Sequence, residues 1–194
     1  VAAVCSANWA VLVAGSDGFY NYRHQSDVFH AYHSLVKKGM NPANIIVMAY
    51  DDIAKDPLNP FPGKVFNKPS YKDPGQDVYQ GVVIDYKGAS VTPQVFMDVL
   101  LGNKAAVAAK GSGRVLESTE QDNVFIFFSD HGAVGLIAFP NQYLYAKDLL
   151  ATLNQMKGRY AKLVFYLETC ESGSMFVNLP KNTNIYALSA AGTS

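Results

Sequence analysis

Two residues in this sequence have side chains that can act together in catalysis: the imidazole of His131 and the thiol of Cys170. Each comes just after a short, nearly continuous apolar run, Val124–Phe128 before the histidine and Leu163–Leu167 before the cysteine. Such runs, rich in β-branched and aromatic residues, are typical of strands buried on both faces of a parallel sheet. If the two strands are neighbours, their ends lie about 5 Å apart, at the edge where open α/β sheets bind ligands. The pair then suits a thiol nucleophile with a histidine base.

The surroundings of the pair strengthen this interpretation, because each residue alone is weak evidence. A lone cysteine is usually inert packing in a core, and a lone histidine is more often a satisfied structural residue. Here small, turn-forming residues follow both, and Gly132 and Gly173 let the backbone approach a bound ligand closely. Backbone N–H groups at such turns can form an oxyanion hole for a tetrahedral intermediate. The pattern therefore favours a nucleophilic role for Cys170.

Polar residues near the pair predict a pocket beside it. Glu168 comes two residues before the cysteine, among apolar neighbours that we expect to be buried, and a buried carboxylate needs a partner. Arg23 is a natural candidate, and the two can form a pocket floor for a side chain that carries both donors and acceptors. Locally, however, Asn21, Arg23 and His24 follow the first strand and precede its helix, where helix-start chemistry and a solvated arginine are the simpler interpretation.

Other chemistries find less support in the sequence. Asp130 precedes the histidine and, by strand alternation, points away from it, so an aspartate that orients His131 is not assured. His30 and His33, at i and i+3, can share a helix face, but no Glu or Cys completes a metal-ligand set. The turn Gly15-Ser16-Asp17-Gly18 lacks the lysine of a phosphate-binding loop and the glycine spacing of a dinucleotide fold. We therefore predict no metal and no cofactor.

Length and composition indicate one globular domain. The chain has 194 residues, of which 49% are hydrophobic, with 16 basic and 16 acidic residues. A chain of this length buries roughly 70% of its unfolded surface, and without net charge it has little to attract nucleic acid or an anionic membrane. No apolar run approaches the roughly 20 residues needed to span a bilayer. We expect no nucleic-acid partner and no membrane insertion.

Apolar runs alternate with helical patterns along the chain, which predicts an α/β sheet with crossover helices. Residues 51–88 are rich in proline and glycine and are too long for an ordinary connection, so they form either a functional surface excursion or a small hairpin. A Gly/Ala-rich stretch at about 102–113 is predicted as a loop. The predicted strands are Trp9–Ala14, Ile45–Ala49, Val124–Phe128, Leu163–Leu167 and Ile185–Ala190, with a short extended piece at Leu136–Phe139, and the predicted helices are Ser26–Lys38, Pro93–Leu101 and Leu144–Lys157.

The amino terminus, residues 1–8, is small and apolar without an initiator methionine. It is typical either of the tail of a signal peptide before its cleavage site or of a disordered end. The chain has two cysteines, too few for a disulfide-rich scaffold. Cys5 is an unsuitable disulfide partner for Cys170 if the latter acts as a thiolate. The cysteines alone do not indicate a compartment.

Five stretches of the sequence, which include the segments around Asn21, His131 and Cys170, resemble the legumain family, the asparaginyl endopeptidases of the caspase-like clan of cysteine peptidases. The resemblance implies an α/β fold with a caspase-like, mostly parallel sheet flanked by helices on both faces. It also implies that residues 9–194 are a peptidase domain truncated at its carboxyl-terminal side, with the family's prodomain absent. The matching stretches are Trp9–Ser16, Tyr20–Gln25, Asp77–Val82, Ser129–Gly132 and Glu168–Met175.

The resemblance also implies roles for the catalytic residues. Cys170 is the expected nucleophile and His131 the general base and acid, while Asn21 corresponds to the family's residue that orients this histidine. Gly132 and Cys170 are expected to supply the oxyanion-hole N–H groups. Asp130 matches an aspartate that family members can convert to a cyclic imide.

The same resemblance predicts the substrate and the setting. Arg23, His24 and Glu168 match part of the S1 pocket that grips an asparagine side chain. The implied reaction is hydrolysis of peptide bonds after Asn, and after Asp at acidic pH, through an acyl-enzyme. Expected partners are protein or peptide substrates with Asn at P1, and cystatin-type inhibitors. Family members are usually zymogens of the secretory pathway, found in lysosomes or vacuoles or secreted.

Three alternatives remain open. A transpeptidase or ligase of the same family would use an amine in place of water. The glycosylphosphatidylinositol transamidase subunit shares the Asn-Tyr-Arg-His segment, but Asp130 and Glu171 argue against it. A non-catalytic fragment that only folds or binds is opposed by the intact His131 and Cys170.

Overall fold

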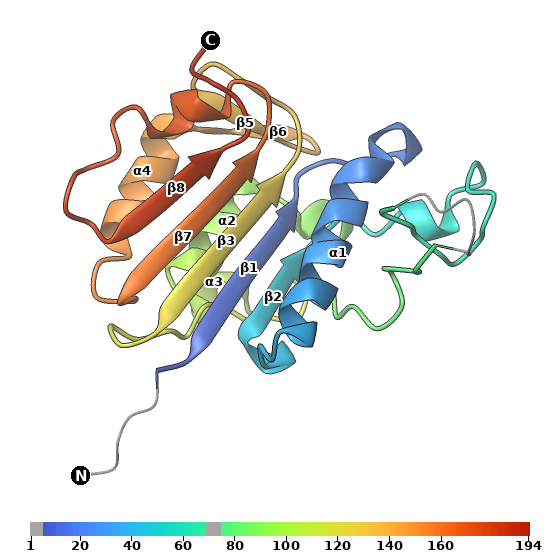
Figure 1. Ribbon diagram of the computed structural model, residues 1–194, viewed down its shortest axis with the longest axis horizontal. Helices are drawn as coiled ribbons and strands as arrows, with labels where there is room; N and C mark the ends of the chain where they lie inside the picture. The colour runs from blue at the N-terminus through green and yellow to red at the C-terminus, as the bar shows by residue number, and fades with distance from the viewer. Residues whose placement is uncertain (1–5, 69–74) are drawn as a thin grey trace.

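The computed structural model describes residues 6–68 and 75–194, which are built around a five-stranded sheet with the strand order β2-β1-β3-β7-β8 (Figure 1). All four pairings are parallel. The prediction of a mostly parallel α/β sheet is confirmed, and each predicted strand boundary lies within one residue of the observed one. The strands are β1 (Asn8–Ala14), β2 (Ile45–Met48), β3 (Asn123–Ser129), β7 (Lys162–Glu168) and β8 (Ile185–Ser189).

Helices cover both faces of the sheet, as predicted. Helix α1 (Tyr22–Lys37) packs on one face, and α2 (Pro93–Leu100), α3 (Lys104–Val107) and α4 (Ala146–Gln155) pack on the other (Figure 1). Thr92 caps α2, because its hydroxyl accepts a hydrogen bond from the Val95 N–H at 3.2 Å.

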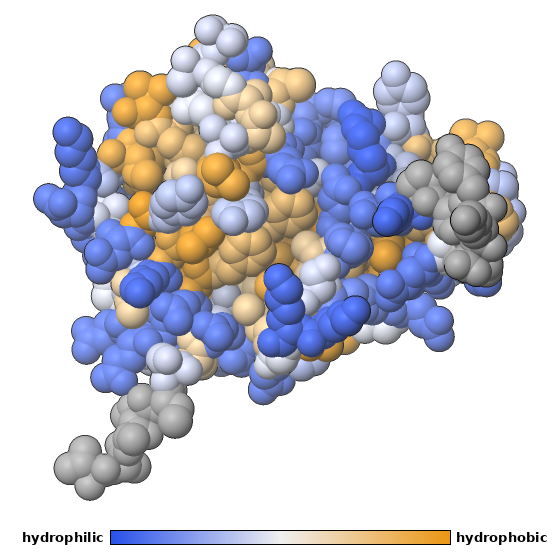
Figure 2. All heavy atoms as spheres, viewed as in Figure 1, coloured by the Kyte–Doolittle hydropathy of each residue, from blue (hydrophilic) through white to orange (hydrophobic). Residues whose placement is uncertain are grey.

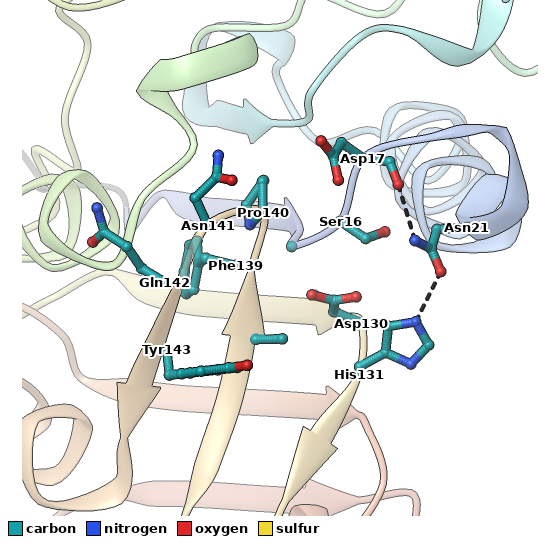
Figure 3. A pocket seen from close by; sticks show the side chains of 12 residues that line it. Ser16, Asp17, Asn21, Asp130, His131, Phe139, Pro140, Asn141, Gln142 and Tyr143 are labelled. Carbon is teal, nitrogen blue, oxygen red and sulfur yellow. Dashed lines mark hydrogen bonds between the residues drawn. The ribbon is translucent and has the colours of Figure 1, made fainter.

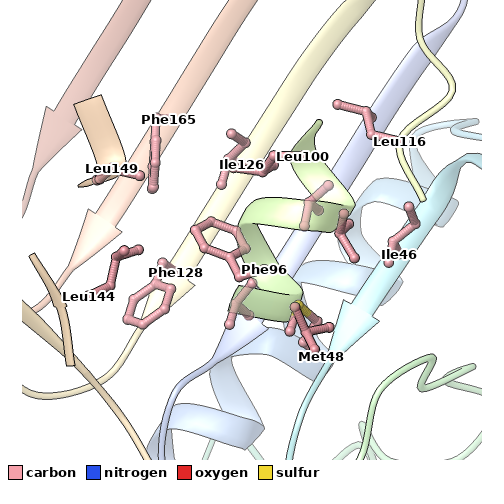
Figure 4. Close-up of a cluster of buried hydrophobic side chains, with 14 of the residues drawn as sticks. Ile46, Met48, Phe96, Leu100, Leu116, Ile126, Phe128, Leu144, Leu149 and Phe165 are labelled. Atoms are coloured by element: carbon pink, nitrogen blue, oxygen red, sulfur yellow. The ribbon is translucent and has the colours of Figure 1, made fainter. Parts of the chain in front are cut away.

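Strand alternation explains the two cores. Side chains of β1 that face α1 join the smaller cluster, and those that face the other way join the larger cluster under α2 and α4 (Figure 4). Both faces of β1 and β2 are buried, whereas β7 and β8 are covered on one face only, and this packing fixes the strands in register so that their carboxyl ends form one edge. The larger cluster includes Ile46, Met48, Phe96, Leu100, Ile126, Phe128, Leu149 and Phe165.

Three predictions of local structure were wrong. The first helix begins at Tyr22 rather than Ser26, and its N-cap residue makes no side-chain capping bond, so the sequence carried no start signal. The predicted helix from Leu144 begins at Ala146, because the residues before it pair as β6 (Gln142–Tyr145) with β5 (Leu136–Phe139). The predicted loop at 102–113 contains the short helix α3.

A second, three-stranded sheet completes this end of the molecule. Its strand order is β4-β5-β6, with β4 spanning Gly132–Ala133 directly after the histidine. The extended piece predicted at Leu136–Phe139 is therefore confirmed as the central strand of this sheet.

The segment 51–88 is an excursion, and its described residues form no hairpin ladder. Two 3₁₀ turns, Ile53–Lys55 and Gly88–Ser90, and two isolated bridges are its regular structure. Its described residues do not include 69–74. The predicted signal-peptide tail also lies mostly outside the described residues, which begin at Ser6, and Cys5 lies outside them.

The outer surface is uneven on the face that carries α1. Figure 2 shows apolar side chains gathered to one side of that helix, over β7 and β8, surrounded by hydrophilic residues. Tyr166, Tyr186 and Leu188 of these strands are exposed. Among the described residues, no helix combines the length and the apolar character that crossing a bilayer requires.

Candidate active site

The two strands that carry His131 and Cys170 are direct neighbours. In the parallel pairing of β3 with β7, Ser129 lies opposite Glu168, so the two strands end at the same level of the carboxyl edge of the sheet. The two residues line one open cavity of about 350 Å³, together with Arg23 and Glu168. The predicted convergence of an imidazole and a thiol is therefore confirmed.

The thiol of Cys170 is free and exposed to solvent. This distinguishes it from the buried, inert cysteines that are common in cores. Directly after it, Glu171 adopts a left-handed conformation with φ of 50°, which is uncommon for a residue other than glycine. Such strained residues cluster at functional sites, where the surrounding structure holds them in place.

Ser174 ties the turn at Cys170 to the hairpin that follows His131. Its hydroxyl donates to the Glu171 carbonyl at 2.6 Å and accepts from the Gly135 N–H at 2.8 Å. These two bonds connect the two loops that carry the candidate nucleophile and base, and they limit relative movement of the loops.

The orientation and tautomer of His131 are set by Asn21. The side-chain nitrogen of Asn21 donates to the Asp17 carbonyl at 2.9 Å, which turns its oxygen toward Nε2 of His131 at 2.8 Å (Figure 3). An amide oxygen can only accept, so Nε2 must carry the hydrogen. In the neutral ring, Nδ1 then has a free lone pair and is the nitrogen able to take a proton.

Gly132 lies too close to the Cys170 turn for any side chain. A Cβ at this position would lie 2.6 Å from the Cys170 carbonyl oxygen and 2.7 Å from the Thr169 hydroxyl. The absence of a Cβ therefore brings the backbone of Gly132 against the turn that carries the thiol.

Asp130 is buried beside His24 and does not bond to His131. Its side chain is 1% exposed, and neither carboxylate oxygen has a hydrogen-bond partner among residues 6–68 and 75–194. Nδ1 of His24 is 3.1 Å from one of these oxygens, but its hydrogen bond is with the Ser16 hydroxyl at 2.7 Å. The short distance between His24 and Asp130 is an electrostatic contact and not a hydrogen bond, because Nδ1 of His24 makes its hydrogen bond with Ser16. His24 is also one of the residues that line the cavity beside Cys170.

Three of these residues also form a group of donor atoms. His24, Asp130 and His131 each offer one atom, and the three atoms lie within 4.8 Å of one another. The sequence pointed instead to His30 and His33 as histidines on one helix face, and no Glu or Cys completed a metal-ligand set with them. The helix α1 brings His24 to both Asp130 and His131, with the His24 and His131 rings 5.0 Å apart and perpendicular.

The predicted ion pair between Arg23 and Glu168 is not present. Arg23 is exposed and donates to the Tyr20 carbonyl at 3.3 Å, and no ion pair of Glu168 occurs within the described ranges. The expectation failed because β7 alternates between buried and exposed residues and ends on an exposed Glu168, which solvent reaches. Both residues nevertheless line the same cavity.

Partial loss of water in the cavity raises the pKa of Glu168 above its usual value, and the negative charge of Asp27 raises it further. Asp27 was not anticipated from the sequence. It lines the cavity and accepts hydrogen bonds from the Asn67 side chain at 2.8 Å and the Ser129 hydroxyl at 3.4 Å. It lies four residues after Arg23, so a helix correctly started at Tyr22 would have placed both on one face.

A second cavity, of about 430 Å³, also borders the imidazole (Figure 3). Asp17, Asn21, Asp130, His131 and Tyr143 are among the residues that line it. His131 and Asp130 line both cavities, so the imidazole borders two spaces that can each hold part of an extended ligand.

Comparisons with known proteins agree with this arrangement. Residues 8–194 match the model of the peptidase C13 family. The chain is 55% identical to a hemoglobinase of Schistosoma japonicum over 94% of its length, and 53% identical to the legumain of Homo sapiens over 95%. It is 51% identical to a vacuolar-processing enzyme, beta-isozyme 1, of Oryza sativa subsp. japonica over 94%. These matches cover 42%, 42% and 37% of the relatives, so the chain spans about two fifths of their length.

Proposed function

The chain belongs to the peptidase C13 family, and from that premise we propose that the protein is a legumain-type cysteine endopeptidase that cleaves peptide bonds after asparagine. One observation carries the proposal: an exposed thiol and an imidazole with one nitrogen held by Asn21 line the same cavity. The mechanism, the specificity and the site roles that follow are part of this proposal.

Acylation uses Cys170 and His131 in sequence. Nδ1 of His131 takes the thiol proton, and Sγ attacks the carbonyl carbon of the substrate asparagine. The backbone N–H groups of Gly132 and Cys170 stabilise the negative oxygen of the tetrahedral intermediate. His131 then gives its proton to the leaving amine as the carbon–nitrogen bond breaks, and a thioester remains on Cys170.

Deacylation repeats these roles with a second nucleophile. His131 takes a proton from a water molecule, the hydroxide oxygen attacks the thioester, and the carbon–sulfur bond breaks. Cys170 recovers its proton and the carboxylic acid product leaves. An amine in place of water gives a new peptide bond, and the second cavity beside His131 is the feature that favours this ligase variant of the reaction, because it can hold the incoming chain.

The cavity beside Cys170 supports specificity for a side-chain amide. Arg23 supplies donors for the amide oxygen, and the carboxylates of Glu168 and Asp27 supply acceptors for the amide nitrogen. An aspartate side chain has no N–H to offer and carries the same charge as Glu168. It fits once Glu168 is protonated, which accounts for the proposed cleavage after Asp at acidic pH.

The setting follows from the family. The names of relatives include a vacuolar-processing enzyme, and we extend to this protein a place in lysosomes or vacuoles of the secretory pathway. An acidic compartment agrees with a cavity whose Glu168 holds its proton more strongly than an ordinary glutamate.

The proposal is tested with the full-length protein and a peptide that carries Ala-Ala-Asn before a fluorophore, at about pH 5–6. We expect fluorophore release, loss of release in Cys170→Ala, and normal release in Cys5→Ala, which removes the other cysteine of the sequence. Release from an Arg or Lys peptide in preference to Asn contradicts the specificity. Unchanged release in Cys170→Ala contradicts the mechanism.

A further inference from the structure

The donor group formed by His24, Asp130 and His131 has a feature that catalysis does not explain. Two regions contribute to it: α1 carries His24, and the two residues between β3 and β4 are Asp130 and His131. Figure 3 shows the Asp130 carboxylate and the His131 ring beside the cavity lined by Ser16 and Asn21. The three donor atoms lie within 4.8 Å of one another.

The Asp130 carboxylate is the unusual member. It is almost fully buried, and within the described part of the chain both oxygens lack a hydrogen-bond partner. A buried charge without a partner is costly, and proteins normally pair such a group or use it to coordinate a metal. His24 does not satisfy it with a hydrogen bond, because Nδ1 of His24 bonds to the Ser16 hydroxyl, and Nδ1 would give up that bond to ligate a cation. A cation among the three side chains would compensate the charge.

The donor set selects the kind of cation. Two imidazole nitrogens and one carboxylate oxygen suit zinc and similar transition metals, whereas calcium and magnesium prefer oxygen ligands alone. Zinc holds such ligands at about 2.0–2.2 Å in a tetrahedral arrangement, which places ligand atoms roughly 3.3 Å apart. The His24–Asp130 pair is already at 3.1 Å. His131 is exposed, so its ring can shift together with the Asn21 side chain that holds Nε2 and close the remaining distance.

We propose that His24, Asp130 and His131 form a binding site for a divalent transition-metal ion of the Zn²⁺ class, and that the bound ion switches off the proteolytic site. Because Asn21 accepts a hydrogen bond from Nε2, the ion would use the lone pair of Nδ1 in His131, the same electrons that must take the thiol proton. Asn21 then acts as an outer partner, because its bond to Nε2 fixes the ring tautomer that ligation needs. Metal binding stands on the geometry alone, whereas the inhibitory effect rests on the proposed function.

The test is a calorimetric titration of ZnCl₂ into the full-length Cys170→Ala protein, in which the reactive thiol cannot account for binding. We expect one Zn²⁺ per chain, and a loss of affinity of at least about tenfold in Cys170→Ala proteins that also carry Asp130→Asn or His131→Ala. His30→Gln is the matched control, because this exposed histidine of α1 is outside the group. Thermal melting checks that each protein is folded, and His131→Ala, which changes an exposed side chain, keeps the test valid if Asp130→Asn does not fold.

The outcomes separate this site from the proposed peptidase activity. Zinc affinity that is unchanged in both Asp130→Asn and His131→Ala, or lowered equally in His30→Gln, overturns the metal site even if the wild-type protein cleaves the asparagine peptide. The expected affinity pattern in a protein that cleaves no asparagine peptide upholds the metal site and contradicts the peptidase proposal. In an active protein, we expect ZnCl₂ to inhibit and a chelator to restore cleavage.

Discussion

Two aspartates flank the same strand and differ in almost every respect. Asp122 precedes β3 at the amino edge of the sheet, and Asp130 follows it at the carboxyl edge. Asp122 accepts hydrogen bonds from the Ala7 N–H at 2.7 Å, the Thr119 N–H at 2.8 Å and the Thr119 hydroxyl at 3.1 Å. Asp130 is equally buried and accepts no hydrogen bond from any described residue.

The difference in hydrogen bonding between Asp122 and Asp130 separates the roles of the two edges of the sheet. Burial acts to raise the pKa of Asp122, but its hydrogen bonds from Ala7 and Thr119 outweigh this effect and hold the pKa below its usual value. At the other edge, Asp130 accepts no hydrogen bond from the residues that the structure describes, and the pKa of Glu168 is raised. The amino edge uses its polar groups for stability, and the carboxyl edge keeps its polar groups free for ligands.

The strongest challenge to this comparison is His131→Ala. Loss of a general base typically costs about 10²–10⁴-fold in rate, and we expect kcat for the asparagine peptide to fall by that amount. The melting temperature should change little, because the side chain is exposed. Steady-state kinetics and thermal melting measure both, with His30→Ala as the matched exposed histidine. A large loss of stability without loss of kcat would mean that the carboxyl edge is structural after all.

A pair of isosteric changes tests the two aspartates directly. Asp122→Asn leaves buried donors without an acceptor and should lower the free energy of unfolding by about 1–3 kcal/mol. Asp130→Asn breaks no hydrogen bond and removes a buried charge, so it should cost less or raise stability. Urea denaturation at neutral pH compares them.

The pH dependence of the free energy of unfolding gives a second check on the role of Asp122. The pKa of Asp122 is lowered on folding, so its stabilising effect is full above the pKa of the unfolded chain and is lost as pH falls through the folded value. The stability gap between wild type and Asp122→Asn should therefore narrow below about pH 4. An equal loss of stability in both variants at neutral pH would remove the contrast between the two edges.

The sequence predicts the carboxyl edge better than it predicts what its side chains do. Val124–Phe128 and Leu163–Leu167 are continuous apolar runs, and the position of His131 and Cys170 follows from where those runs end. The partners of the two aspartates cannot be predicted in this way. Asp122 bonds to Ala7, 115 residues away in the chain, and nothing local indicates that contact.

The errors at the candidate site have two physical origins, the exposed end of β7 at Glu168 and the direction of side chains from α1. The helix begins at Tyr22 without a side-chain cap, so the sequence placed Arg23 in a loop, from which it could reach Glu168. In the helix, Arg23 turns to the Tyr20 carbonyl instead. The same late start hid Asp27, which shares the cavity with Glu168 because helical residues four apart lie on one face.

The smallest expected effect is a change in the ratio of Asp to Asn cleavage, caused by repulsion between Glu168 and a substrate aspartate. Its pKa is raised by loss of water and by Asp27, so as pH falls it takes up a proton earlier than an ordinary glutamate does. Repulsion of a substrate aspartate weakens at that point, and the ratio of Asp to Asn cleavage rises. In Glu168→Gln the side chain is neutral at every pH, so this ratio should already be raised at neutral pH and should depend less on pH. Measurements of kcat/KM for paired Asn and Asp peptides, with the exposed Glu120→Gln as control, test this. A Glu168→Gln ratio equal to that of the wild type at neutral pH would show that another group excludes the aspartate, and the carboxyl edge would then select its substrate without using the charge of Glu168.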